Sequence, residues 1–266
     1  MKQLIIIVAC LFSFNSIQAQ DKESPNVVLM LVDNLGFGDL SVYNGGIRGG
    51  MKTPNIDRLA NEGMRFTQFL VEPGCTPSRA GLMTGQYSIR NGMSMVIVPG
   101  MAGGLDETDY TLGKLFKAAG YNTAYVGKWH LGPLAESQPQ NQGFDKWLLG
   151  FRGTTDQTVY PEHMKTVGAS EELQKAFTIK IVEADSPGEA KIVRDYDFEY
   201  RKIIEEDITH KSVAYINEYA KKKEPFFLMI GFTRPHYPND VSDKYKGKSG
   251  VGKYGDSVVE LDERAG

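Results

Sequence analysis

The chain has 266 residues, of which 41% are hydrophobic and 24% are charged, a balance that is typical of a soluble globular protein. This length is enough for one large domain or two small ones. The formal net charge is −3 and no long basic run is present, which argues against a nucleic-acid-binding surface.

Residues 1–19 have the pattern of a secretory signal peptide. Lys2 gives a positive start, residues 4–14 are apolar, and Ala19 is a small residue at a plausible cleavage point. The apolar run is too short to span a bilayer. We therefore predict an exported protein, periplasmic or secreted, with no stable membrane anchor. Lipid attachment at Cys10 is the less favoured alternative, because the apolar run continues beyond that residue.

The first predicted strand covers residues 26–32, a continuous apolar run after Pro25 that is typical of a strand buried on both faces. It ends in Asp33 and Asn34. Oxygen-bearing side chains at the carboxyl end of a central strand lie where open α/β sheets place their ligands. They suit a hard cation, Ca²⁺ or Mg²⁺. For an isolated Asp-Asn pair, an Asx turn that closes the strand is the alternative.

A short helix is predicted over residues 53–63, with Thr53 as its N-cap and Gly63 as its terminator. The apolar run of residues 64–71 then predicts a strand that leads into the next turn.

The segment that follows combines a nucleophile with a cation. Gly74 marks a turn, Pro77 fits the first turn of a helix, and Gly85 is placed to end it. Cys75 is therefore expected at a helix N-terminus, where unpaired N–H groups favour an anion. Arg79 lies about one helical turn further and can face the same anion.

Removal of residues 1–19 would leave Cys75 as the only cysteine. An exported protein with one cysteine cannot form an internal disulfide, so this thiol is either inert in a core or chemically special. Its place in a turn flanked by glycine and proline favours the second interpretation.

Residues 75–79 read Cys-Thr-Pro-Ser-Arg, which resembles the signature of the formylglycine-dependent (type I) sulfatases of the alkaline phosphatase superfamily. In that family a maturation enzyme oxidises the cysteine to an aldehyde, formylglycine, whose hydrate is the nucleophile. For the motif alone, a packed cysteine at a helix start is the alternative. A tyrosine phosphatase loop is excluded, because its arginine lies further from its cysteine.

A further helix is expected between Thr111 and Gly120, followed by a strand over residues 121–126. Gly-Lys-Trp-His follows directly and resembles the second sulfatase signature. Lys128 and His130 alternate along an extended segment, so both can point to one side.

Residues 203–223 predict an amphipathic helix, and residues 225–232 predict another buried strand. The strand leads into Thr-Arg-Pro-His-Tyr-Pro, which resembles the Pro-His-x-Pro segment of the sulfatases. His236 is therefore expected at the same edge of the sheet.

The resemblance implies an α/β fold, with a mostly parallel central sheet and helices on both faces. It covers nearly all of residues 25–266 but roughly the first half of the family's length. Residues 20–266 are thus expected to be the N-terminal part of a sulfatase catalytic domain. The family's Ser/Thr-Asp-Asn-Gly segment, which supplies two metal ligands, and a later sulfate-binding lysine are not among these residues. We therefore expect the chain as given to be catalytically inactive.

The resemblance also implies roles for individual residues. Asp33, Asn34 and Cys75, as formylglycine, correspond to ligands of Ca²⁺ or Mg²⁺. The family's usual pair is Asp-Asp, so Asn34 gives this site one negative charge fewer. Arg79 and the cation hold the oxygens of the nucleophile.

The remaining site residues are expected to bind the substrate. Lys128 balances charge on the sulfuryl oxygens. His130 contacts the formylglycine hydroxyl and helps to collapse the enzyme–sulfate ester. His236 is placed as the proton donor to the leaving alcohol or phenol.

The implied partners are a formylglycine-generating maturation enzyme and a sulfate ester, either of an aryl alcohol or of a carbohydrate. No nucleic-acid partner is expected. Two alternatives remain: a phosphate- or phosphonate-ester hydrolase of the same superfamily, and a non-catalytic fragment.

Overall fold

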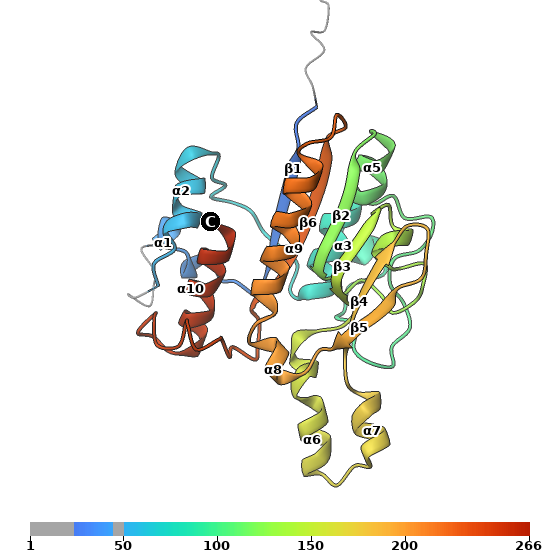
Figure 1. Ribbon diagram of the computed structural model, residues 1–266, viewed down its shortest axis with the longest axis vertical. Coiled ribbons are helices and arrows are strands. Elements are labelled where there is room, and N and C mark those ends of the chain that lie inside the picture. The colour runs from blue at the N-terminus through green and yellow to red at the C-terminus, as the bar shows by residue number, and fades with distance from the viewer. Residues whose placement is uncertain (1–23, 45–50) are drawn as a thin grey trace, which may run out of the picture.

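The computed structural model describes residues 24–44 and 51–266 (Figure 1). The predicted signal peptide over residues 1–19 and the alternative lipid site at Cys10 lie outside the described residues. None of the helices in the described ranges is both long and apolar enough to cross a membrane.

The described residues form one sheet of six strands in the order β1-β6-β2-β3-β4-β5. The strands are β1 (Val27–Asp33), β2 (Asn122–Lys128), β3 (Lys146–Phe151), β4 (Lys180–Asp185), β5 (Lys191–Asp195) and β6 (Phe226–Pro235). The four strands β1, β6, β2 and β3 run parallel, and β4 and β5 pair antiparallel at one side. The predicted fold class, a mostly parallel α/β sheet, is confirmed.

Helices cover both faces of this sheet. The α-helices are α1 (Ser41–Asn44), α2 (Pro54–Glu62), α3 (Cys75–Thr84), α4 (Ser88–Asn91), α5 (Leu112–Ala118), α6 (Tyr160–Thr166), α7 (Glu171–Ala176), α8 (Phe198–Arg201), α9 (Ile204–Tyr219) and α10 (Lys253–Ala265). The described residues also contain the short 3-10 helices η1 (Phe37–Asp39), η2 (Pro139–Asn141) and η3 (Thr155–Val159). Figure 1 shows α9 in front of the sheet and α3 behind it.

The described residues form two hydrophobic cores, because successive side chains along each strand point to opposite faces of the sheet. On β2, Ala124 and Val126 pack with residues of α9 in one cluster. Tyr125, between them, packs in the other cluster with Ala80 and Met83 of α3. The apolar runs of the central strands therefore serve two cores, and this burial fixes the strand ends in place.

The predicted strand over residues 64–71 is wrong. This segment has no regular structure, and Phe69 and Leu70 are 68% and 91% exposed. A strand needs a neighbour for its backbone hydrogen bonds, and in residues 24–44 and 51–266 no strand pairs with this segment. High β-propensity alone does not form a strand here.

A buried ion pair holds the carboxyl end of β6. Arg234 Nε donates to Glu260 Oε2 of α10 at 2.8 Å, and both side chains are fully buried. The same guanidinium donates to the carbonyl oxygens of Arg201 and Lys202 at the end of α8. Three elements are thus joined directly behind the segment that carries His236.

Candidate active site

The carboxyl ends of neighbouring strands bring the polar residues together. Asp33 ends β1, Lys128 ends β2, and His236 follows β6, which lies between those two strands. Cys75 and Arg79 come from the first turns of α3. Because parallel strands share one edge of a sheet, residues distant in the sequence meet there.

Asp33 lies at the centre of a cluster of buried charged side chains. Lys128 Nζ donates to Asp33 Oδ2 at 2.5 Å, and one guanidinium nitrogen of Arg79 lies 3.6 Å from Asp33 Oδ1. All three side chains are almost completely buried. Burial alone would raise the pKa of Asp33, but Lys128 and Arg79 outweigh it and hold that pKa well below its ordinary range. The carboxylate is therefore ionised at any physiological pH.

Cys75 is the first residue of α3, as predicted. Gly74, with φ of 120°, precedes it as the N-cap, a left-handed conformation that favours glycine. Gly85 ends the helix with φ of 66°. The Cys75 sulfur lies 3.6 Å from Lys128 Nζ. Burial nevertheless raises the pKa of the thiol, so the unmodified side chain is a neutral thiol and a poor nucleophile.

Arg79 is fixed by a tyrosine that the sequence patterns did not identify. One guanidinium nitrogen donates to the carbonyl oxygen of Lys128 at 2.7 Å and to the Tyr125 hydroxyl at 3.2 Å. The Tyr125 hydroxyl donates to the same carbonyl at 2.6 Å. From the sequence, Tyr125 was predicted only as part of a strand. A local pattern does not distinguish a core tyrosine from one that orients a functional arginine.

His130 differs from the extended geometry that its spacing predicted. Its φ is 60°, so the backbone turns into the left-handed region directly after β2. Its Nε2 lies 2.7 Å from the carbonyl oxygen of Ile97, and since a carbonyl can only accept, Nε2 carries the proton. Nδ1 is buried and has no partner among the described residues. Burial, together with the charge of Lys128, lowers the pKa of His130 to about 3.

His236 is held by two threonines that were also missed. Its Nδ1 lies 2.6 Å from both the Thr155 hydroxyl and the carbonyl oxygen of Tyr237, and its Nε2 lies 3.2 Å from the Thr154 hydroxyl. Burial and Lys128 lower the pKa of His236. The threonines follow β3 in a stretch without a recognisable motif, so only the strand order β6-β2-β3 reveals them.

Three side chains offer ligand atoms to a cation. Atoms of Asp33, Cys75 and His236 all lie within 4.8 Å of one another. The ionised oxygens of Asp33 suit Ca²⁺ or Mg²⁺, whereas a thiol sulfur and an imidazole nitrogen suit softer cations. Asp33 therefore fits the predicted metal, and position 75 would fit it once an oxygen replaces the sulfur. Asn34 adjoins this group but is exposed, with φ of 64°, a left-handed conformation that asparagine tolerates. Its role as a ligand stays a prediction.

Comparisons with known proteins identify the family of this chain. The Sulfatase family model matches residues 25–264. This chain belongs to the sulfatase family. Arylsulfatase A of Homo sapiens is 36% identical over 91% of this chain and 47% of its own length. N-acetylgalactosamine-6-sulfatase of Rattus norvegicus is 32% identical over 98% of this chain and 49% of its own length.

A sulfatase of known structure has the same fold. The PsFucS1 sulfatase from Pseudoalteromonas sp. matches with a TM-score of 0.82 at 32% identity, over 91% of this chain and 50% of that chain. The chain thus spans about half the length of the curated relatives that it matches.

Proposed function

We propose that this sulfatase hydrolyses sulfate esters, with Cys75 converted to formylglycine and Ca²⁺ or Mg²⁺ bound at Asp33. One observation carries the proposal: the Lys128 ammonium lies between the Asp33 carboxylate and the Cys75 sulfur. A nucleophile position, a fixed positive charge and an ionised oxygen ligand therefore occupy one buried cluster. This is the chemistry needed to bind a sulfate group and attack its sulfur.

Each residue then has a task in the reaction. Asp33, with Asn34, would hold the cation, which when bound supplies positive charge to the sulfate oxygens. Arg79 and Lys128 add charge that is already fixed in position, so no reorganisation is required as negative charge develops. The hydrate of formylglycine at position 75 supplies the attacking hydroxyl.

The two histidines move protons. His130 has a free Nδ1 lone pair, which can accept a proton from the hydroxyl at position 75. His236 donates a proton to the oxygen of the departing alcohol. Thr154 and Thr155 contact opposite nitrogens of that ring and fix its orientation.

The proposal includes a partner and a location. A formylglycine-generating enzyme must modify Cys75 while residues 75–79 are still accessible, because Cys75 and Arg79 are buried in the folded chain. An exported protein, periplasmic or secreted, fits the apolar N-terminal segment of the sequence. The substrate is a sulfate ester of an aryl alcohol or a carbohydrate.

The modification gives a direct test. After coexpression with a formylglycine-generating enzyme, the tryptic peptide that contains Cys75 is expected to be lighter by roughly 18 Da, since oxygen replaces sulfur and two hydrogens are lost. Peptide mass spectrometry measures this difference. Cys75→Ala serves as the control, because it cannot form the aldehyde. An unmodified thiol in the coexpressed protein would argue against the proposal.

Turnover tests the reaction itself. A modified version extended through the further metal ligands of the family pattern is expected to hydrolyse 4-nitrophenyl sulfate faster than 4-nitrophenyl phosphate. The reverse order would favour the phosphate-ester alternative. We further expect residues 20–266 alone to show no turnover, since further metal ligands of the family pattern are not among them. Equal turnover by residues 20–266 and by a version extended through those ligands would contradict this expectation.

A further inference from the structure

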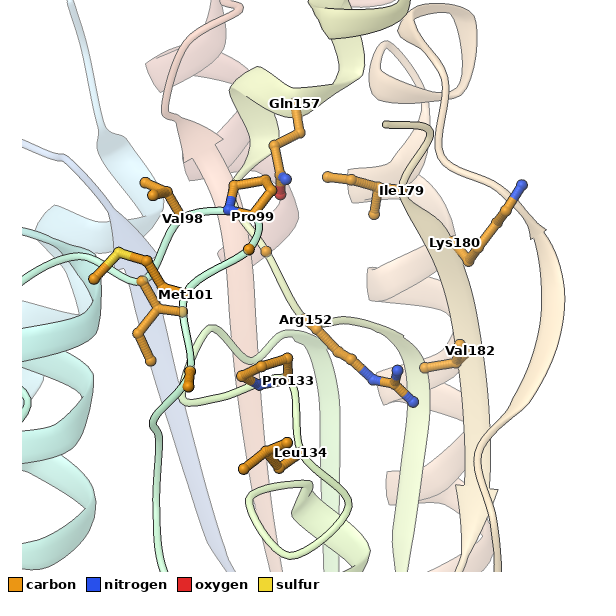
Figure 2. Close-up of a pocket in the computed structure, with 14 residues that line it drawn as sticks. Val98, Pro99, Met101, Pro133, Leu134, Arg152, Gln157, Ile179, Lys180 and Val182 are labelled. Atoms are coloured by element: carbon orange, nitrogen blue, oxygen red, sulfur yellow. The ribbon is translucent and has the colours of Figure 1, made fainter. Parts of the chain in front are cut away.

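A pocket of about 520 Å³ lies beside the candidate active site (Figure 2). Its walls are mainly apolar and come from the loop over residues 97–102, from Pro133 and Leu134, and from Ile179 and Val182. Two cationic residues, Arg152 and Lys180, also line it. The pocket therefore combines an apolar surface with positive charge.

Hydrogen bonds connect two walls of the pocket to the two histidines of the proposed reaction. Ile97, on one wall, accepts a hydrogen bond from His130 through its carbonyl oxygen. Gln157, on another wall, accepts from the backbone N–H of Thr154, whose hydroxyl contacts His236 Nε2. His236 is the proposed proton donor to the departing alcohol, so a pocket connected to it is a candidate site for that alcohol.

The two cations of the pocket differ in their partners. Lys180 forms an ion pair with Asp195 at 2.5 Å. Arg152 has no hydrogen-bond or ion-pair partner within residues 24–44 and 51–266. Figure 2 shows its side chain extending toward Val182. Burial lowers the pKa of Arg152, but a guanidinium stays charged at physiological pH. Arg152 is exposed and lines the pocket, so its guanidinium is accessible there to an anionic group of a ligand.

We propose that this pocket receives the alcohol part of the substrate, and that Arg152 binds a second anionic group, a sulfate or a carboxylate, on that part. The inference rests on the proposed function and makes it narrower: the preferred substrate is a sulfate ester that carries one further negative charge. The planar guanidinium can bind either group through two parallel hydrogen bonds. The apolar walls suit the carbon skeleton that joins the two anions.

Binding measurements separate the two anion types. The parent protein is the full chain with Cys75→Ala, which removes turnover. Its ligands are N-acetylgalactosamine 6-sulfate, N-acetylgalactosamine 4,6-disulfate, and a uronyl-N-acetylgalactosamine 6-sulfate disaccharide. We expect calorimetry to give a Kd about tenfold lower for one or both ligands with the second anion than for the monosulfate. The disulfate identifies sulfate recognition, and the disaccharide identifies carboxylate recognition.

Arg152→Met is expected to remove this difference and to leave the Kd of the monosulfate unchanged. Lys180→Met is the matched control, because Lys180 lines the same pocket but is already paired, and it should keep the difference. Arg152→Lys should keep part of it. Equal Kd values for all three ligands, or a difference that survives Arg152→Met, would overturn the proposal.

One ligand distinguishes failure of this inference from failure of the proposed function. The unsulfated uronyl-N-acetylgalactosamine disaccharide carries a carboxylate but no sulfate ester, so it tests the pocket alone. If it binds and Arg152→Met weakens it, the pocket proposal holds even when no sulfate ester is hydrolysed. If neither ligand with a second anion binds more tightly than the monosulfate while 4-nitrophenyl sulfate is hydrolysed, the pocket proposal fails and the proposed function holds.

Discussion

Asp33→Asn is expected to abolish divalent-cation binding and to lower the free energy of unfolding by about 3–5 kcal/mol. The Asp33 carboxylate lies 2.5 Å from Lys128 Nζ and 3.6 Å from Arg79, and all three side chains are buried. An amide would leave two buried cations without a countercharge, which is more costly than the loss of a single hydrogen bond. It would also remove the only carboxylate oxygens among the three grouped ligands, Asp33, Cys75 and His236.

Calorimetric titration with Ca²⁺ and urea unfolding measure the two effects. Asp39→Asn is the matched control, because this nearby carboxylate accepts hydrogen bonds from Tyr254 and Gly36 outside the charge cluster. Asn34→Asp is the opposite change: a second carboxylate should tighten Ca²⁺ binding, since carboxylate number tunes affinity. Unchanged Ca²⁺ affinity in Asp33→Asn would show that the cation binds elsewhere.

The strands that carry the site could be predicted because their signals are local. Continuous apolar runs predicted β1 and β6, and the segment after Gly120 predicted β2, each to within a few residues. β6 is buried throughout, as such a run predicts. The predicted burial of β1 on both faces is wrong, because β1 lies at the edge of the described sheet and Val28 and Met30 are 42% and 37% exposed. The helix that starts at Cys75 was predicted from turn and helix-end residues, whose backbone preferences are equally local. Motif resemblance then identified the strand-end residues Asp33, Lys128 and His236.

The contacts between these residues could not be predicted in the same way. Lys128 meets Asp33 because β6 lies between β1 and β2, and a local pattern does not encode strand order. His130 leaves the extended conformation after β2, so alternation no longer describes it. Thr154 and Thr155 contact His236 although they lie about 80 positions earlier in the chain. The segment over residues 64–71 is the opposite case: its local pattern predicted a strand, but among the described residues no neighbouring strand pairs with it.

The second large effect is expected from Glu260→Gln, which should lower the free energy of unfolding by about 3–5 kcal/mol. Glu260 accepts a hydrogen bond from Arg234 at 2.8 Å, and neither side chain is exposed. Glutamine would leave the buried guanidinium facing a neutral group. Arg234 also donates to carbonyl oxygens at the end of α8, and Arg201 of α8 donates to the His236 carbonyl oxygen at 2.7 Å. The change should therefore displace His236 as well and lower the kcat of a modified version extended through the further metal ligands.

A double variant tests whether the ion pair itself stabilises the fold, or whether the loss of stability comes from leaving one buried charge unpaired. Burial raises the pKa of Glu260 although Arg234 opposes this shift, so desolvation of the carboxylate outweighs the attraction of its partner. Replacing both charges by apolar residues, Arg234→Met with Glu260→Leu, should then cost less than either single change. Urea unfolding of the four proteins measures the coupling. Glu218→Gln, which affects only the exposed pair with Lys222, should leave stability unchanged. Strictly additive losses at Arg234 and Glu260 would mean that the two side chains act independently and that the ion pair does not hold the end of β6.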